Sequence, residues 1–226
     1  MIQIENISKS YSSKEVLKNV SITFDKGKVY GIAGENGSGK TTLFRCIAGL
    51  EKCSGGIKSE FENLKNHLGF LQTEPYFFSR ITGKEYLQLF SNARNIKSSD
   101  FESWNIFNLP LNQYAITYST GMKKKLALTA ILLQQNEVFI LDEPFNGVDI
   151  HSNIIITGII KRLRELNKIV IISSHIFSTL NDTCDEIYLL ENGVFTRKVL
   201  KSEFKQFERE MKDFVLGSRI EKLKLR

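Results

Sequence analysis

A glycine-rich segment near the N-terminus constrains this 226-residue chain more than any other feature. Residues 34–42 read Gly-Glu-Asn-Gly-Ser-Gly-Lys-Thr-Thr and fit the pattern G-x-x-x-x-G-K followed by Ser or Thr. The apolar run 29–33 in front predicts a buried strand, and the apolar residues behind recur at helical spacing. A strand that leads through glycines into a helix directs backbone N–H groups and a helix N-terminus at one anion. The segment therefore predicts a phosphate-binding loop.

Single residues of this loop carry specific expectations. Lys40 is expected to reach the β- and γ-phosphates of a nucleotide, and Thr41 to offer its hydroxyl to Mg²⁺. The rest of the loop is expected to cradle the phosphates through its backbone; these residues are Gly34, Asn36, Gly37, Ser38, Gly39 and Thr42. A glycine-rich turn that binds nothing is the alternative, but it does not account for Lys and Thr at these offsets.

Composition and charge narrow the class of protein. A hydrophobic content of 42% and a charged content of 25% are ordinary for a globular domain. No apolar run approaches the roughly 20 residues of a membrane-spanning helix, and no signal peptide is evident at the N-terminus. The three scattered cysteines (Cys46, Cys53 and Cys184) have no metal-ligand spacing and suit a reducing compartment.

The basic surplus of the chain does not point to nucleic acid. The formal net charge is +6, but residues 196–226 alone hold ten Lys or Arg against five Asp or Glu. A basic tail is not a basic groove, so no nucleic-acid partner is expected. An amphipathic helix is predicted within this tail from the apolar spacing after Phe204.

The order of predicted elements indicates an α/β fold. Two strands (2–11 and 16–24) precede the loop, and further buried strands are predicted over 137–141, 168–174 and 186–190. Helices are predicted over 150–166 and 176–181, and a hairpin turn over 191–193. Between the two halves, residues 76–134 are predicted to form an inserted helical lobe. Its helices are expected from Thr82, with Glu85 closing a capping box, from Ser98 or Ser99 towards Phe107, and from about Thr120 to Gln134.

Two acids end the predicted strand 137–141. Asp142 would stand at the carboxyl end of a buried strand, where ligands bind in open α/β sheets, and hold Mg²⁺ opposite Thr41. Glu143 would then be placed to polarise an attacking water. The alternative is a solvated strand end without chemistry.

Four more residues suit the same scheme, although each alone is more often structural. Gln72 ends a predicted strand and could reach Mg²⁺ or the attacking water. His175 follows another strand and could hydrogen-bond a γ-phosphate oxygen. Tyr11 could stack on a base, or be a packed aromatic. Asp149 could instead be a helix cap.

Taken in order, these residues resemble the nucleotide-binding domain of ATP-binding cassette (ABC) transporters. The resemblance covers about residues 1–195. It matches Tyr11 to the adenine-stacking A-loop, Gln72 to the Q-loop and His175 to the switch histidine. Residues 34–42 match Walker A, 118–122 the signature motif, 140–144 Walker B with its catalytic glutamate, and 146–149 the D-loop.

The signature departs from the usual Leu-Ser-Gly-Gly-Gln, since residues 118–122 read Tyr-Ser-Thr-Gly-Met. Ser119 and Gly121 are kept, and their hydroxyl and N–H are expected to meet a γ-phosphate at a helix N-terminus. This variant, together with residues 81–87, looks like the exporter branch of the family.

The resemblance implies an α/β P-loop NTPase of ABC type: a mostly parallel sheet core, an N-terminal antiparallel β subdomain and the inserted helical lobe. The chain is expected to be one such domain, with the core at about 1–75 and 135–195, the lobe at 76–134 and a basic C-terminal extension at 196–226. ATP and Mg²⁺ are the implied cofactors, and ATP hydrolysis coupled to transport the implied activity. The implied partners are a separate transmembrane permease and a second ATP-binding subunit, identical or similar. The implied location is cytoplasmic, peripheral on the inner face of the membrane through the permease.

Other classes of nucleotide-binding protein fit the sequence less well. A GTP-binding switch should carry Asn-Lys-x-Asp, but Asn167-Lys168 is followed by Ile169-Val170. A non-transport ABC ATPase of DNA repair or translation stays open as the alternative, and an inactive structural cassette conflicts with Lys40, Glu143 and His175. The aromatic residues 76–78 are a hypothetical permease-docking surface, or else lobe core.

Overall fold

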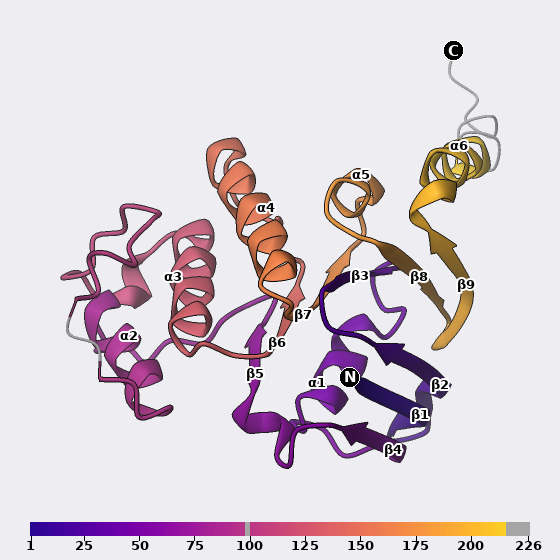
Figure 1. The fold of residues 1–226 in the computed structure, drawn as a ribbon, viewed down its shortest axis with the longest axis horizontal. Helices are drawn as coiled ribbons and strands as arrows, with labels where there is room; N and C mark the ends of the chain where they lie inside the picture. The colour runs from indigo at the N-terminus through magenta and orange to yellow at the C-terminus, as the bar shows by residue number, and fades with distance from the viewer. Residues whose placement is uncertain (98–99, 216–226) are drawn as a thin grey trace.

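The described residues of the computed structural model, 1–97 and 100–215, form two sheets and the helices around them (Figure 1). The larger sheet has the strand order β5-β6-β7-β3-β8-β9. Its strands are β3 (Lys28–Ala33), β5 (Leu68–Leu71), β6 (Val138–Asp142), β7 (Ile169–Ser174), β8 (Glu186–Glu191) and β9 (Val194–Leu200). The first five run parallel, and β9 returns antiparallel to β8 through the predicted hairpin.

The smaller sheet is antiparallel, with the order β2-β1-β4, and contains β1 (Ile2–Tyr11), β2 (Lys14–Phe24) and β4 (Ser54–Ser59). The helices are α1 (Lys40–Ile47), α2 (Gly83–Asn92), α3 (Thr120–Leu133), α4 (Ile150–Glu165), α5 (Phe177–Asn181) and α6 (Phe204–Val215). The predicted α/β fold class, with its mostly parallel sheet and antiparallel β subdomain, is confirmed.

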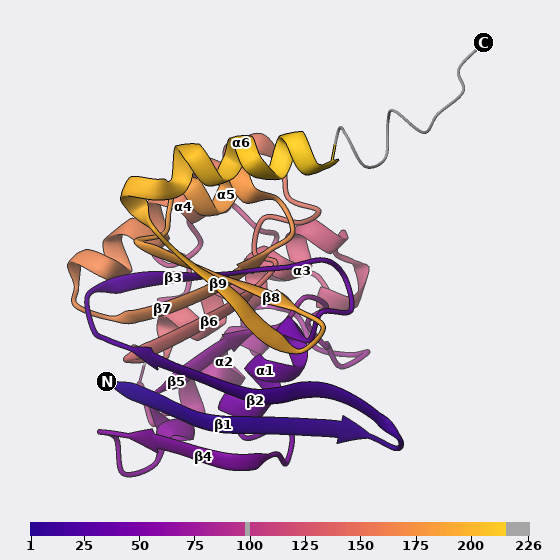
Figure 2. The same cartoon turned by 90° about the vertical axis from the view of Figure 1, so that its right-hand side faces the viewer.

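Helix α1 lies between the two sheets (Figure 2). Alternate side chains of the central strands point to this side, among them Ile140 and Ile171, and they pack with Leu43 and Phe44 of α1. The inward face of β1 and β2 closes the same core. Since the phosphate loop enters α1, this packing fixes the loop against both sheets.

The opposite face of the large sheet is covered by α3, α4, α5 and α6 (Figures 1 and 2). The other alternate residues of the same strands, such as Phe139, Leu141 and Val170, belong to this second core. Both faces are therefore buried, which explains why β6 and β7 read as continuous apolar runs. Phe204 and Phe207 of α6 pack on Phe177 of α5, so the predicted amphipathic helix docks on its own domain.

The parallel strands bring the candidate residues to one edge of the sheet. Asp142 pairs in register with Ser173, and Ala33 with Ser174. The chain leaves β3 into the phosphate loop, β5 into Gln72, β6 into Glu143 and β7 into His175. Carboxyl ends of parallel strands are where open α/β sheets bind ligands.

The helical segment between the two halves of the core departs from its prediction in one place. Of the helix expected from Ser98 or Ser99 towards Phe107, residues 98–99 lie outside the described part, and the described residues 100–107 form turns. The side chain of Asn105 donates to Leu109 O and accepts from Leu109 N, and Asp100 accepts from Ser103 N. Such side-chain bonds to the backbone compete with a helix, so the prediction of a helix here was wrong.

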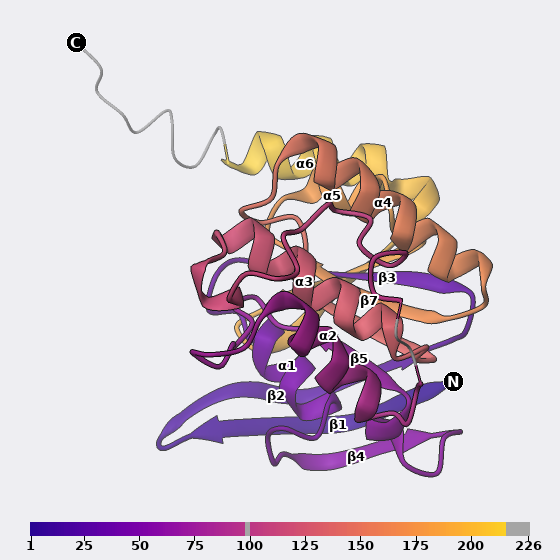
Figure 3. The same cartoon turned by 90° about the vertical axis from the view of Figure 1, so that its left-hand side faces the viewer.

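The predicted capping box at the start of α2 is present (Figure 3 shows α2 and α3 in front). The Thr82 hydroxyl accepts from Glu85 N at 3.2 Å, and the Glu85 carboxylate accepts from Thr82 N at 2.8 Å. The hydrogen bonds that the carboxylate accepts from Thr82 N and from the Thr82 hydroxyl hold the pKa of Glu85 below its usual value.

Replacing the cap tests its contribution to stability. Thr82→Ala is expected to lower the free energy of unfolding by about 1 kcal/mol, because Glu85 N loses its acceptor. Thr82→Ser keeps the hydroxyl and serves as the control, with a smaller effect expected. Urea unfolding followed by circular dichroism measures both; equal loss in the two variants would contradict the cap.

Candidate functional site

The phosphate loop takes its shape from glycines in a left-handed backbone conformation. Gly37 has φ 85° and Gly39 has φ 111°, values that favour residues without a Cβ. Gly39 is also the N-cap of α1, and a Cβ there would lie 3.1 Å from Val16 O of β2. The loop therefore sits between the helix that it opens and the β1–β2 hairpin.

Lys40 lies folded into this loop. Its Nζ donates to Gly34 O at 2.7 Å and Glu35 O at 3.1 Å, and stands 4.0 Å from Glu143 Oε1. Burial lowers the pKa of Lys40, while the charges of Glu143 and Asp142 oppose that shift. The ammonium group is thus held at the centre of the loop, beside the acids that end β6.

Asp142 is fully buried and accepts three hydroxyl hydrogen bonds. Thr41 and Thr73 donate to its Oδ2, both at 2.7 Å, and Ser173 donates to Oδ1 at 2.6 Å. Thr73 and Ser173 were not predicted as site residues. The only signal in the sequence is that each lies within two residues of the end of a strand and within two residues of the predicted Gln72 or His175.

Glu143 follows in a conformation that is unusual for a residue with a side chain. Its φ is 51°, and its N–H donates to Ser173 Oγ at 2.9 Å. One carboxylate oxygen, Oε2, lies 3.0 Å from His175 Nδ1. A non-glycine residue in the left-handed region persists only when its surroundings hold it there, and such residues cluster at functional sites.

Among the described residues, two buried polar atoms of this site have no hydrogen-bond partner. They are Glu143 Oε1 and Ser38 Oγ of the phosphate loop. Buried polar groups are normally satisfied, so unpaired ones call for a further ligand. Hydroxyl and carboxylate oxygens are the ligands that Mg²⁺ prefers, and the glycine loop suits phosphate groups. The residues present therefore fit a nucleotide with its magnesium ion.

The remaining predicted residues lie around this centre. Gln72 is half-buried and directly precedes Thr73, while Asn36 is exposed and Thr42 half-buried on the loop and α1. Tyr11 is 39% exposed at the end of β1, with Lys9 Nζ 4.8 Å from its ring centroid. The close approach of Gly39 to Val16 places the β1–β2 hairpin, which carries Tyr11, beside the phosphate loop. The contact described for the Tyr11 ring is with Lys9 of its own strand.

Ser119 and Gly121 start α3, on the lobe side of the sheet. Ser119 is the N-cap of α3, exposed, and accepts from Met122 N at 3.3 Å. Gly121 needs its missing side chain, because a Cβ there would lie 2.7 Å from Gly147 O. The segment that carries Ser119 and Gly121 thus packs on the turn before α4.

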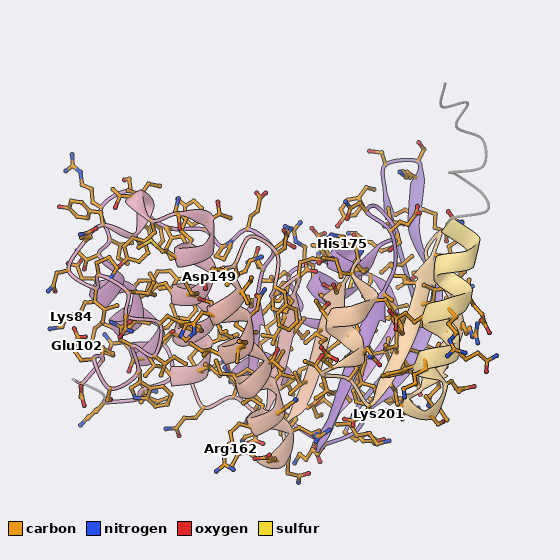
Figure 4. All side chains as sticks on the ribbon, turned by 90° about the horizontal axis from the view of Figure 1, so that it is seen from above. Lys84, Glu102, Asp149, Arg162, His175 and Lys201 are labelled. Carbon is orange, nitrogen blue, oxygen red and sulfur yellow. The ribbon has the colours of Figure 1, made fainter. Side chains whose placement is uncertain are left out.

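Asp149 caps α4 at the end of that turn. It accepts from Ser152 N and Ser152 Oγ, both at 2.8 Å, and from Lys125 Nζ at 3.3 Å. The two bonds from Ser152 hold the pKa of Asp149 far below its usual range. Figure 4 labels Asp149 and His175 between the lobe, marked by Lys84, and α6, near Lys201.

Comparison with known proteins decides the family. The family model described as "ABC transporter" matches residues 17–146, which span the phosphate loop, Gln72, the start of α3 and the acids of β6. The chain belongs to the ABC transporter family. None of the helices within residues 1–97 and 100–215 combines the length and the apolar character of a membrane span.

Relatives of this family member are transport proteins. It is 30% identical to the ABC transporter ATP-binding protein NatA of Bacillus subtilis, over 97% of this chain and 98% of the relative. It is also 30% identical to the bacitracin transport ATP-binding protein BcrA of Enterococcus faecalis (95% and 74%). The lantibiotic transport ATP-binding protein SrtF of Streptococcus pyogenes is 28% identical (90% and 91%).

Solved structures agree on the fold. The ATP-binding subunit of an ABC transporter superposes with a TM-score of 0.82 at 24% identity, covering 92% of this chain and 93% of that one. The dimeric cassette MJ0796 with ADP and Pi gives 0.79 at 21% identity, covering 89% and 99%. The family model and the relatives, in turn, show that this chain is an ATP-binding subunit of an ABC transporter, with ATP hydrolysis coupled to transport. The transport assignment replaces the alternative of a DNA-repair or translation ATPase.

Proposed function

We propose that this chain powers an exporter, with its catalytic centre at the edge where β3, β5, β6 and β7 end. The observation that carries the proposal is the convergence of Lys40, the triply bonded Asp142 and the Glu143–His175 pair beside one glycine loop. The names of relatives that transport bacitracin and a lantibiotic support export, as does the Tyr-Ser-x-Gly-Met signature.

The phosphate loop would bind the nucleotide and its ion. Lys40 would exchange its bonds to Gly34 O and Glu35 O for phosphate oxygens, and Tyr11 would stack on adenine. Gly34, Asn36, Gly37, Ser38, Gly39 and Thr42 would complete the cradle. Mg²⁺ would be held by Thr41, Asp142 and Gln72, and would neutralise charge on the phosphate oxygens.

Glu143 would act as the general base. Oε1 has no hydrogen-bond partner within the described protein, so it is the oxygen available to a water, while Oε2 lies 3.0 Å from His175 Nδ1. A proton on Nδ1 would let His175 donate to Glu143 and orient its carboxylate. Proton transfer to a group fixed within hydrogen-bond reach lowers the barrier to attack on the γ-phosphate.

A second ATP-binding subunit would complete the site. Ser119 is exposed at the N-terminus of α3, and its hydroxyl would meet a phosphate that another subunit holds; Gly121 is buried in the first turn and would contribute through its backbone N–H. Because one chain carries one phosphate loop and one signature, two chains would form two composite sites. The partner is a second copy or a similar cassette.

A separate permease would dock on the lobe, and the chain would then lie in the cytoplasm at the inner face of the membrane. Of the aromatic residues 76–78, Phe77 is only 5% exposed and packs on Tyr86, so for this residue the alternative of lobe core holds. Tyr76 and Phe78 are 72% and 54% exposed and contact each other edge to face, with ring centroids 5.4 Å apart. These two rings are the docking surface that we propose.

Glu143→Gln tests the catalytic role. The variant is expected to bind ATP and accumulate as a closed dimer, with turnover reduced by at least about a hundredfold, since an amide is not a base. Gel filtration with ATP and phosphate release measure the two effects. Glu165→Gln, an exposed site on α4, is the matched control, and near-normal hydrolysis by Glu143→Gln would refute the role.

Lys40→Ala is expected instead to weaken ATP binding itself.

Charge on the exposed rings tests the docking surface. Tyr76→Asp with Phe78→Asp is expected to abolish co-purification with the membrane partner, because docking would bury two carboxylates against apolar surface. Leu50→Asp, at a residue 59% exposed outside the lobe, is the control. Unchanged recovery of the partner by the double variant would remove these rings from the interface.

A further inference from the structure

A buried lysine that belongs to none of the matched motifs connects α3 to the turn that follows β6. Lys124 is only 2% exposed, whereas its neighbours Lys123 and Lys125 are half-buried. Its Nζ donates to Glu143 O at 2.7 Å and to Asn146 O at 2.9 Å. A lysine is rarely this buried, and it stays so only where its donors are satisfied.

The two carbonyls that Lys124 holds belong to one tight turn. Asn146 N donates to Glu143 O at 3.2 Å, so this oxygen is both the start of the turn and an acceptor for Lys124. The turn begins at Glu143, with its φ of 51°, and leads into Gly147, on which Gly121 packs. Lys124 therefore fixes both ends of the segment whose first residue is the proposed base.

The charges of the acids at the candidate site act on the ammonium group of Lys124. Burial lowers the pKa of its ammonium group, and the charges of Glu143, Asp142 and Glu74 oppose that shift. An apolar residue in this position would leave Glu143 O with one partner fewer and remove a cation from among these acids. A buried, hydrogen-bonded charge can specify one conformation where packing alone would allow several.

We infer that Lys124 is a positioning residue for ATP hydrolysis, one that sets the backbone of Glu143 and so aims its carboxylate. The inference rests on the proposed role of Glu143. Ser119 is the N-cap of the same helix, α3, so the proposed signature contact and the proposed base are joined through one element.

Lys124→Met tests the inference in the complex with its co-purified membrane partner. Methionine keeps most of the length of the side chain and removes the donors. We expect kcat to fall by at least about tenfold, with the ATP dissociation constant changed by less than about twofold. Lys123→Met, one residue away on the same helix, is the matched control and should leave both quantities unchanged.

Two further readouts separate positioning from a general loss of structure. In the nucleotide-free chain, amide hydrogen exchange over residues 143–149 should quicken in Lys124→Met and not in Lys123→Met. In the Glu143→Gln background, Lys124→Met should lower the residual turnover by less than about twofold, because both changes act through one group. An additional tenfold loss in that background would overturn the inference.

The possible results distinguish this inference from the proposed function. If Glu143→Gln is inactive and Lys124→Met is fully active, only the inference fails. If Glu143→Gln itself turns over normally, the role of Glu143 fails first. Should Lys124→Met not fold, Lys124→Gln decides: its side chain is one bond shorter and cannot hold both carbonyls at these distances. A drop of kcat by at least about threefold supports positioning, and unchanged kcat contradicts it.

Discussion

The buried carboxylate of Asp142 is the interaction on which the rest of the site depends. Burying an ionised carboxylate is unfavourable unless its oxygens are hydrogen-bonded. Here the donors come from three separate elements: Thr41 from α1, Thr73 from the segment after β5, and Ser173 from β7. One side chain thus ties the phosphate-loop helix, the entry to the lobe and the neighbouring strand together at the edge of the sheet. Ser173 also accepts from Glu143 N, so the same hydroxyl helps to place the next acid.

The sheet makes this convergence physically possible. Its central strands are buried on both faces, so their polar groups can emerge only at the strand ends, and parallel pairing brings those ends to one edge. Two cores then hold the edge from opposite sides. Helix α1 fixes the loop from the side of the antiparallel sheet, and α3 reaches Glu143 from the other through Lys124. The proposed catalytic residues therefore lie where the unusual backbone conformation of Glu143 is held by contacts from both sides of the sheet.

Much of this arrangement could be predicted from residues in sequence order. The loop around Lys40, the strand before Asp142 and the cap at Thr82 each have a local pattern with one physical meaning. Thr73 and Ser173 have none, because a hydroxyl at a strand end is common and only the strand order shows where it points. Lys124 is the middle one of three consecutive lysines, and nothing in such a run indicates which of them is buried; only tertiary packing buries Lys124. The turns after Asp100 arose from side-chain bonds of Asn105 and Asp100, which no helical period reveals.

The central claim, that Asp142 is held ready to bind Mg²⁺ beside the nucleotide, is tested most directly by calorimetric titration of ATP with and without magnesium. Asp142→Asn keeps the shape of the side chain and removes its charge. The account predicts that Mg²⁺ tightens ATP binding by at least about tenfold in the natural chain and by less than about threefold in Asp142→Asn, since the ion loses its anionic ligand. Equal tightening by Mg²⁺ in both proteins would contradict it.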